Sequence, residues 1–229
     1  IQIKQEGTGD AVRSARANLE GQDFDNVLIL LGDAPLITPE TLQLMINKRM
    51  ETGAAVVVAG FRPKDALRYG RLVTSGDTLE KIVEFKDATN SEREINFCNS
   101  GIFCVDGKLI WKLVEQLNSN NAAGEYYITD IISIAAQMGY KSSFIEGSEQ
   151  EFAAANTREE LANLEAIFQN KARSLAMKNG ATLIDPNTIY FSYNTELGKD
   201  VIVEPGVIFG PNVKVEDRSI IKGFAHLEN

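Results

Sequence analysis

Residues 26–60 decide the fold, and they read NVLILLGDAPLITPETLQLMINKRMETGAAVVVAG. The stretch opens with Asn26–Leu31, a short continuous apolar run of the kind that forms a parallel strand buried on both faces. Thr38 is suited to cap a helix, and Pro39 is suited to its first turn. Apolar residues then recur at helical spacing, at Leu42, Met45, Ile46 and Met50. A second apolar run, Ala54–Gly60, follows, so the order strand, helix, strand predicts a βαβ unit whose right-handed crossover makes the sheet parallel.

Beyond this unit the pattern predicts short strands and further helices. Ser75-Gly76-Asp77 is typical of a hairpin turn between two strands. We expect strands at Arg71–Thr74, Lys81–Val83 and Phe97–Val105, and helices at Lys108–Leu117, Ile128–Met138 and about Thr157 to Lys178. One face of the last helix would be formed by Leu161, Leu164, Phe168 and Leu175. The prediction is therefore an α/β fold, with a Rossmann-like sheet and an antiparallel insertion.

The C-terminal end of the chain has a different period. Two apolar series repeat every six residues, namely Val201, Val207, Val213 and Val203, Phe209, Val215. Gly206 and Gly210, with Pro205 and Pro211, mark the corners between them. This period predicts the start of a left-handed parallel β-helix built from hexapeptide repeats, and an ordinary β-meander is the alternative. We expect three parts, namely an α/β domain at 1–155, a connecting helix at 156–180 and the first repeats at 181–229.

Composition and charge narrow the class of function. The net charge of -9 argues against a nucleic-acid partner, because backbone phosphates are bound by clustered Lys and Arg. No apolar run approaches the roughly 18 residues that span a bilayer, and no signal peptide is visible, so we expect a cytoplasmic protein without membrane insertion. Cys98 and Cys104 lie on one predicted strand, about 20 Å apart and beyond disulfide reach. Because His226 is the only histidine, the composition argues against a His-based triad or a multi-His metal site.

Two polar segments near the start of the chain are candidates for binding a phosphate-bearing ligand. Gly7-Thr8-Gly9-Asp10-Ala11 precedes a helix that we expect to begin near Ala11. Its glycines would let backbone amides approach an anion, although a plain capping turn explains the segment equally well. Asp33 lies just beyond the C-terminal end of a predicted strand, where open α/β sheets bind ligands. Its carboxylate would suit Mg²⁺, and the alternative is an aspartate that caps its own turn.

A second group of candidates consists of Gly70, Glu84, Asn99, Tyr127 and Thr129. Glu84 ends a predicted strand, and Asn99 interrupts an apolar one, where burying an unpaired amide is costly. Asn156 precedes Thr157-Arg158-Glu159 with the spacing of an N-cap and its N3 glutamate, which favours a helix cap over a ligand. For each residue taken alone, a structural role is the commoner explanation.

Seven motifs occur in order along the chain. They are GTGDA (7–11), LLGDAPLI (30–37), YGR (69–71), IVEFKDAT (82–89), CNSGI (98–102), NNAAGEYYITD (120–130) and AAANTREEL (153–161). With the hexapeptide repeats that follow, they resemble the family of bacterial bifunctional N-acetylglucosamine-1-phosphate uridyltransferases and glucosamine-1-phosphate acetyltransferases. GEYYITD and KDAT are specific to this family, whereas GTG and GD are shared across nucleotidyltransferases. The resemblance implies a nucleotidyltransferase sheet for the α/β part.

The resemblance also implies a role for each matching residue. The uracil nucleotide would be contacted by Gln2, Gly7 and Thr8, with Leu31 and Gly32 beside it. Mg²⁺ would be held by Asp33 and Asn156, which would thereby act in catalysis. The N-acetylglucosamine side would be lined by Gly70, Glu84, Asn99, Tyr127 and Thr129. The family usually has Tyr in place of Leu31, His in place of Asp10 and Asn-Thr-Gly in place of Asn99-Ser100-Gly101.

The implied reaction joins N-acetylglucosamine-1-phosphate to the uridylyl group of UTP, which gives UDP-N-acetylglucosamine and pyrophosphate. The attacking phosphate is already anionic, so the reaction needs no general base and relies on positioning and charge neutralisation. The parent protein would also acetylate glucosamine-1-phosphate with acetyl-CoA, form a homotrimer through its β-helix and supply the precursor of peptidoglycan and lipopolysaccharide. The alternatives are a nucleotidyltransferase for another sugar-1-phosphate and a catalytically silent scaffold or regulatory subunit.

The family pattern extends beyond both ends of this chain. Its first strand, glycine-rich triphosphate loop and phosphate-binding Lys would precede Ile1, and most of the acetyltransferase β-helix would follow Asn229. His226 stands too early in the repeats to be the catalytic histidine of that domain. We therefore expect that this chain by itself does not turn over UTP.

Overall fold

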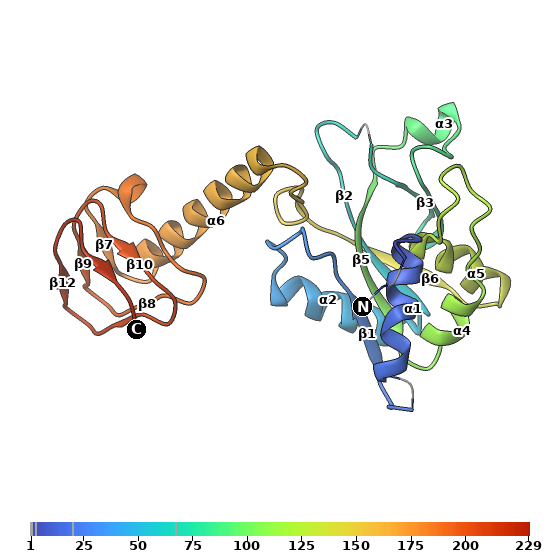
Figure 1. Ribbon diagram of the computed structural model, residues 1–229, viewed down its shortest axis with the longest axis horizontal. Helices are drawn as coiled ribbons and strands as arrows, with labels where there is room; N and C mark the ends of the chain where they lie inside the picture. Colours follow the sequence, from blue (N-terminus) through green and yellow to red (C-terminus); the bar gives the residue numbers. More distant parts are fainter. Residues whose placement is uncertain (1, 3, 20, 67) are drawn as a thin grey trace. The chain divides into compact units, whose positions relative to one another are not determined.

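The computed structural model describes residues 2, 4–19, 21–66 and 68–229, and it divides into two compact units, Ile1–Ala154 and Ala155–Asn229 (Figure 1). One mixed sheet forms the centre of the first unit, and three small parallel sheets form the second. Both cysteines are free and buried. In the described residues, none of the helices combines the length and the hydropathy that crossing a membrane requires.

The sheet of the first unit has the strand order β4-β3-β5-β2-β6, with β1 also paired to β5. Its strands are β1 (Asn26–Ile29), β2 (Val56–Phe61), β3 (Arg71–Ser75), β4 (Thr78–Val83), β5 (Cys98–Asp106) and β6 (Ser142–Glu146). β2 pairs antiparallel with β5 and parallel with β6. β3 and β4 form an antiparallel hairpin, which confirms the turn predicted between them.

The long strand β5 separates β1 from β2. One edge of β5 pairs with β2, and the other edge pairs with β1 at residues 103–106 and with β3 at Cys98. β5 runs antiparallel to both β1 and β2, so β1 and β2 point in the same direction, as the predicted βαβ unit requires. The prediction that the sheet of this unit is parallel is wrong, because the antiparallel strand β5 lies between the two. β1 is also only half-buried and ends at Ile29, which contradicts the predicted strand Asn26–Leu31 buried on both faces.

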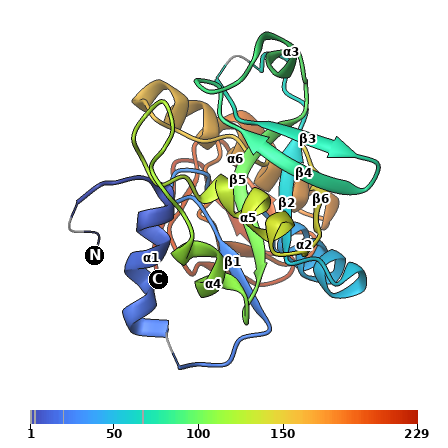
Figure 2. The same ribbon diagram turned by 90° about the vertical axis from the view of Figure 1, so that its right-hand side faces the viewer.

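The first unit has helices on both faces of its sheet. They are α1 (Thr8–Leu19), α2 (Pro39–Thr52), α3 (Asn90–Arg93), α4 (Ile110–Glu115), the 3-10 turn η1 (Ile128–Asp130) and α5 (Ile131–Gln137). β2 is buried along its whole length, as its apolar sequence predicts. Val56 and Val58 face a core formed with α4 and α5, whereas Val57 and Ala59 face a core that includes Met45 of α2. Side chains alternate along a strand, so one apolar strand supports two layers of helix. α1 packs beside α4 (Figure 2).

The ends of two helices test the local signals in the sequence. The side chain of Thr38 caps α2, which confirms the predicted cap, and Gly53 ends the helix with a left-handed φ of 64°. α1 begins at Thr8, three residues before the start predicted near Ala11. The glycines on either side of Thr8 are therefore part of the helix start, and their contacts belong to the site described below.

The second unit begins with the long helix α6 (Arg158–Lys178) and continues in short strands. They are β7 (Thr182–Leu183), β8 (Glu196–Leu197), β9 (Ile202–Val203), β10 (Ile208–Phe209), β11 (Lys214–Val215), β12 (Ile220–Ile221) and β13 (His226–Leu227), with the 3-10 turn η2 (Pro186–Thr188). β9–β12, β8–β11 and β10–β13 pair in parallel between residues 18 positions apart, such as Ile202 and Ile220. The chain visits the three sheets in rotation, and these parallel pairings exclude an antiparallel meander.

The backbone of this unit repeats every six residues. Left-handed φ angles occur at Asp200, Gly206, Asn212, Arg218 and Phe224. Five of the six inward positions predicted from the hexads are buried, with Val201, Val203, Val207, Phe209 and Val213 at most 8% exposed, whereas Val215 is only half-buried. The corner predicted at Gly206 is confirmed by its φ of 76°. At the next corner, which Gly210 and Pro211 mark in the sequence, the left-handed residue is Asn212. Asn tolerates a left-handed φ better than most residues other than glycine. The six-residue repeat of left-handed φ angles therefore continues at a corner that has no glycine in that position.

The buried face of α6 differs from the predicted one. Leu161 and Leu175 are each 57% exposed, and Leu164 is buried. The buried positions further along the helix are polar, because Gln169 and Arg173 bond to backbone carbonyls of residues 187–191. The apolar stripe read from the sequence is therefore only partly correct, since the loop against which α6 packs needs hydrogen-bond donors.

Candidate functional site

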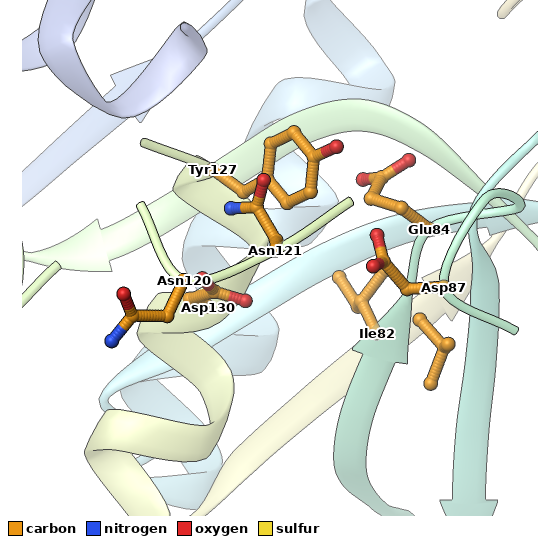
Figure 3. A pocket seen from close by; sticks show the side chains of 8 residues that line it. Ile82, Glu84, Asp87, Asn120, Asn121, Tyr127 and Asp130 are labelled. Atoms are coloured by element: carbon orange, nitrogen blue, oxygen red, sulfur yellow. The ribbon is translucent and has the colours of Figure 1, made fainter. Parts of the chain in front are cut away.

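A cavity of about 210 Å³ lies between the turn that follows β4 and the segment that precedes α5. Its lining residues are Ile82, Val83, Glu84, Asp87, Asn120, Asn121, Tyr127 and Asp130 (Figure 3). These eight residues include three carboxylates, two amides and a phenol, but no Lys or Arg. Carboxylate and amide oxygens accept hydrogen bonds from hydroxyl groups, so the lining suits a neutral polyhydroxylated ligand better than a phosphate.

Glu84 is the residue around which the predicted site residues gather. The hydroxyl of Thr129 donates a hydrogen bond of 3.1 Å to Glu84 Oε1. A Cβ added at Gly70 would lie 3.4 Å from both carboxylate oxygens, so the absence of a side chain there leaves space beside Glu84. Asn99 donates its backbone N–H to the carbonyl of Gly70 at 2.9 Å. The structure thus brings together Gly70, Glu84, Asn99 and Thr129, which come from four separate segments.

The side-chain oxygen of Asn99, which lies within an apolar strand, has a hydrogen-bond partner in the same strand. Its Oδ1 accepts a hydrogen bond of 2.9 Å from the backbone N–H of Gly101, two residues further on. Gly101 has a left-handed φ of 79°, and this bend lets the side-chain oxygen reach the N–H. The oxygen of Asn99 is therefore used within the strand, as the structural explanation expected.

Burial raises the pKa values of Glu84, Tyr127 and Asp130 in the cavity, and neighbouring charges add to the rise. Burial raises the pKa of the Glu84 carboxyl above its ordinary value, the charges of Asp130 and Asp87 add to the rise, and the Thr129 hydrogen bond acts against it. Burial, followed by the charge of Asp87, also raises the pKa of Asp130 and that of Tyr127. A ligand that donates hydrogen bonds to these carboxylates would stabilise their charged forms.

The Gly7-Thr8-Gly9 segment lies against the backbone that leads into the cavity. The N–H of Gly9 donates to the carbonyl of Tyr126 at 2.7 Å, and Thr8 Oγ1 accepts from the N–H of Ile128 at 3.1 Å. A Cβ added at Gly7 would lie 2.6 Å from the Tyr126 oxygen, and one added at Gly9 would lie 2.9 Å from it. The glycines are therefore required by protein packing, a reason that neither the anion nor the capping interpretation considered.

Gln2 and the residues after β1 complete the predicted nucleotide side. The side-chain amide of Gln2 donates to Asp10 Oδ2 at 2.6 Å and to the carbonyl of Gly7 at 3.3 Å. Leu31 packs against Gly101, where an added Cβ would clash with its side chain. Gly32 and Asp33 follow in an exposed turn. Leu31 thus has a packing role next to the Asn99 strand.

Asn156 is not the cap of α6. The N-cap is Thr157, whose hydroxyl accepts from the N–H of Glu160 in a capping box. Asn156 is exposed and contributes its backbone N–H, which donates to Glu160 Oε2 at 2.6 Å. Asp33 belongs to the first unit and Asn156 to the second, so a shared metal ion stays a prediction. In the part of the chain that the structure describes, no group of three or more His, Cys, Asp or Glu is placed to hold a metal.

Four polar residues of the cavity were not among the predicted site residues. They are Asp87, Asn120, Asn121 and Asp130. Asp87 follows Glu84 in the IVEFKDAT motif, and the other three stand in NNAAGEYYITD. The density of acidic and amide residues in these motifs was the available signal, but the motifs are 30 or more residues apart and only the fold brings them together.

A comparison with protein families matches residues 2–123 to a model described as the MobA-like NTP transferase domain. A "Bifunctional protein GlmU" from Rhodospirillum rubrum is 49% identical over 229 residues, which cover 100% of this chain and 51% of that protein. The protein of the same name from Paramagnetospirillum magneticum is 48% identical over 229 residues, with the same coverage of 100% and 51%. These relatives confirm the resemblance seen in the motifs. The chain spans about half the length of the curated relatives it matches.

A solved structure supports the fold independently of sequence. The nucleoside-diphosphate-sugar pyrophosphorylase of Vibrio cholerae aligns with a TM-score of 0.54 and 12% identity over 72% of this chain and 66% of that chain. At this identity the likeness concerns the fold alone. It confirms a mixed α/β sheet of the nucleotidyltransferase type.

Proposed function

The chain belongs to the MobA-like NTP transferase family, and from this we propose that it forms the part of a bifunctional protein that transfers a uridylyl group from UTP to N-acetylglucosamine-1-phosphate. The products are UDP-N-acetylglucosamine, a precursor of peptidoglycan and lipopolysaccharide, and pyrophosphate. The proposal draws on the shared name of relatives that match the whole chain, and on the chemistry of the cavity.

The observation that carries the proposal is the meeting of Gly70, Asn99 and Thr129 around Glu84, which lines the cavity. Glu84 presents a carboxylate next to space that Gly70 leaves open, and its pKa is raised by burial. A sugar ring offers several hydroxyl donors and no charge, which fits acceptors that lack a neighbouring cation. In this arrangement Glu84 accepts from a sugar hydroxyl, and Tyr127 supplies an aromatic ring at the wall of the cavity.

The segment Glu125–Asp130 connects the sugar side with the proposed nucleotide side. Its backbone bonds to Thr8 and Gly9, while its Thr129 and Tyr127 side chains belong to the sugar side. A nucleotide near Gly7–Gly9 and a sugar near Glu84 would therefore contact one short piece of chain. Holding two reactants in a fixed geometry is the main contribution that such an enzyme makes, because the sugar phosphate needs no proton removed before it attacks.

Asp33 and Asn156 are the residues that would hold Mg²⁺ in the whole protein. Both side chains are exposed and carry an oxygen atom that can bind a metal ion. The side chain of Asn156 is not the helix cap, because Thr157 caps α6. Oxygen ligands from one or two side chains are what Mg²⁺ requires when substrate phosphates supply the remainder. When bound, the ion would neutralise phosphate charge, while the residues of this chain bind and orient the sugar.

We also propose that the second unit is the start of a left-handed parallel β-helix. The support is the 18-residue parallel register and the left-handed corner at every sixth residue. Three short strands per coil and two inward residues per hexad are the pattern of hexapeptide-repeat helices. In the whole protein this helix would carry acetyl transfer from acetyl-CoA to glucosamine-1-phosphate and would assemble a homotrimer.

The proposal is tested by titrating nucleotide sugars into the ¹⁵N-labelled chain. We expect UDP-N-acetylglucosamine to shift the amide signals of Gly70, Asn99 and Thr129, and to do so at lower concentration than UDP-glucose or ADP-glucose. A preference for another nucleotide sugar would replace the proposed substrate with another sugar-1-phosphate. If none of the three perturbs these amides, the chain is a scaffold or regulatory part and the proposed function is wrong. Pyrophosphate release from UTP, Mg²⁺ and sugar phosphate gives the matching activity measurement on a chain of the relatives' length.

A further inference from the structure

A loop at residues 118–125 lies at the rim of the cavity and is tied to the turn after β4. Asp87 Oδ1 accepts a hydrogen bond of 2.9 Å from the backbone N–H of Ala122, although the two residues are 35 positions apart. Asp87 itself closes that turn, because its N–H donates to the carbonyl of Glu84 at 3.0 Å. One aspartate thus joins the loop to the turn that carries the central carboxylate of the cavity.

The loop holds its own shape through Asn121. The side-chain oxygen of Asn121 accepts from the N–H groups of Ala123 and Glu125, each at 3.2 Å, and its amide donates to the carbonyl of Glu125. The loop is therefore a preformed piece whose position relative to the sheet depends on its attachments. Asn121 and Asp87 both line the cavity, and Figure 3 shows Asp87 beside Glu84 at the end of β4.

The far end of the loop is attached to a different element. Tyr126 donates its N–H to the carbonyl of Glu6 at 2.8 Å and accepts from Gly9 at 2.7 Å, and the guanidinium of Arg13 lies 4.3 Å from the centre of its ring. These attachments do not involve Asp87. Loss of the Asp87 bond would free the sugar side of the loop and leave the Gly7–Gly9 side in place.

We propose that Asp87 is a positioning residue for the sugar half of the site, and that it acts by fastening the 118–125 loop through the Ala122 N–H. The role rests on the proposed function, since it assigns a sugar to this cavity. Asp87 holds the loop through the geometry of its acceptor oxygen, and its negative charge is dispensable for that task. An asparagine can present the same Oδ1 to Ala122, whereas an alanine cannot, so two substitutions separate the acceptor from the charge.

The test compares D87A, D87N and the control D77N by amide-proton exchange of Ala122 and by affinity for UDP-N-acetylglucosamine and for UMP. Asp77 is an exposed turn aspartate at the other end of the same strand, and its substitution changes the net charge equally. We expect D87A to accelerate Ala122 exchange by about tenfold and to weaken UDP-N-acetylglucosamine binding by about tenfold, the effect of one lost hydrogen bond. UMP affinity should stay within about twofold, and D87N and D77N should resemble the wild-type chain in all three measurements.

Several results would overturn the proposal. Unchanged Ala122 exchange in D87A removes the fastening itself. Accelerated exchange with unchanged affinity removes the positioning role, and an equal loss of UMP binding means that the substitution disturbs the whole unit. A D87N chain as weak as D87A shows that the charge is required. If the wild-type chain binds no nucleotide sugar, the proposed function fails and the role in binding fails with it, while the Ala122 exchange rates still decide whether Asp87 fastens the loop.

Discussion

Replacement of Gln169 by Leu should destabilise the second unit, because the Gln169 side chain pairs with both the backbone N–H and the backbone carbonyl of the buried Phe191. Gln169 is 3% exposed. Its amide donates to the carbonyl of Phe191 at 2.8 Å, and its Oε1 accepts from the N–H of Phe191 at 2.9 Å. Phe191 is itself buried, in the core of the unit. Leu has a similar size but neither a donor nor an acceptor, so the substitution leaves both backbone groups unpaired.

The magnitude follows from the two lost bonds. Leaving a buried donor or acceptor without a partner costs about 1–3 kcal/mol, and two such groups would cost about 2–6 kcal/mol. The upper part of that range assumes that water cannot reach either group and that the backbone does not relax. A buried leucine also avoids the cost of desolvating an amide, so we expect a loss of about 2–4 kcal/mol. That is a large part of the total for a unit whose whole stability is on the usual scale of about 5–15 kcal/mol.

Native-state hydrogen exchange measures this loss separately in each unit. The amides of Ile202 and Phe209 hold backbone bonds in the second unit, and that of Asp106 holds one in the first. The free energy of opening should fall in Q169L at Ile202 and Phe209 and stay unchanged at Asp106. The control is Glu165→Ala, which removes only the exposed side-chain partner of Gln169, and it should cost no more than about 0.5 kcal/mol. A change below about 0.5 kcal/mol in Q169L would refute the reasoning, since it would mean that the Phe191 groups find other partners at no cost.

Two further substitutions test the cavity and the bend beside it. Glu84→Gln should leave the free energy of unfolding near that of the wild-type chain at pH 4 and raise it at pH 7. Burial raises the pKa of the Glu84 carboxyl, so the folded wild-type chain binds more protons than the unfolded chain. The wild-type chain therefore loses stability as the pH rises through that range. Urea unfolding at the two pH values measures this, and equal differences at both would contradict it; the same variant should bind UDP-N-acetylglucosamine more weakly. Gly101→Ala should cost about 1–3 kcal/mol, because Gly101 has a φ of 79° and a Cβ there would clash with Leu31. Unfolding followed by the fluorescence of Trp111, the only tryptophan, reports on the first unit, and adding Leu31→Ala should restore part of the loss by removing the clash but not the strain.

The elements that could be predicted from the sequence are those whose signals lie within a few residues. The run Ala54–Gly60 is apolar at every position, and β2 is buried at every position. Thr38 and Gly53 mark the ends of α2 because a cap and a left-handed residue are properties of the local backbone. The six-residue period of the C-terminal end appears in the φ angles for the same reason. Composition also favoured a chemistry without histidine, which remains part of the proposed mechanism.

Strand pairing was decided by the tertiary structure. The run at Asn26–Leu31 is apolar after its first residue, like β2, yet β1 is half-buried and pairs with one edge of β5. The spacing of apolar residues along the sequence does not predict which strands are neighbours in the sheet. The hydrogen bonds between strands connect backbone groups, and nearly every residue carries the same ones. β5 lies between β1 and β2, and its side chains are buried in the hydrophobic cores on both faces of the sheet. Its position therefore depends on the packing of the whole unit.

Which polar residues are buried was also decided by the tertiary structure. Gln169 and Arg173 are buried while Leu161 and Leu175 on the same helix are exposed, because the backbone of residues 187–191 requires donors that leucine lacks. Asp87 and Ala122 meet across 35 positions at a cavity whose lining no single motif contains. The sequence by itself determined the buried strand β2, the ends of α2 and the six-residue period of the C-terminal end. Only the tertiary structure decided their neighbours, since a hydrogen bond or a buried contact between distant segments depends on where the chain returns and not on local preference.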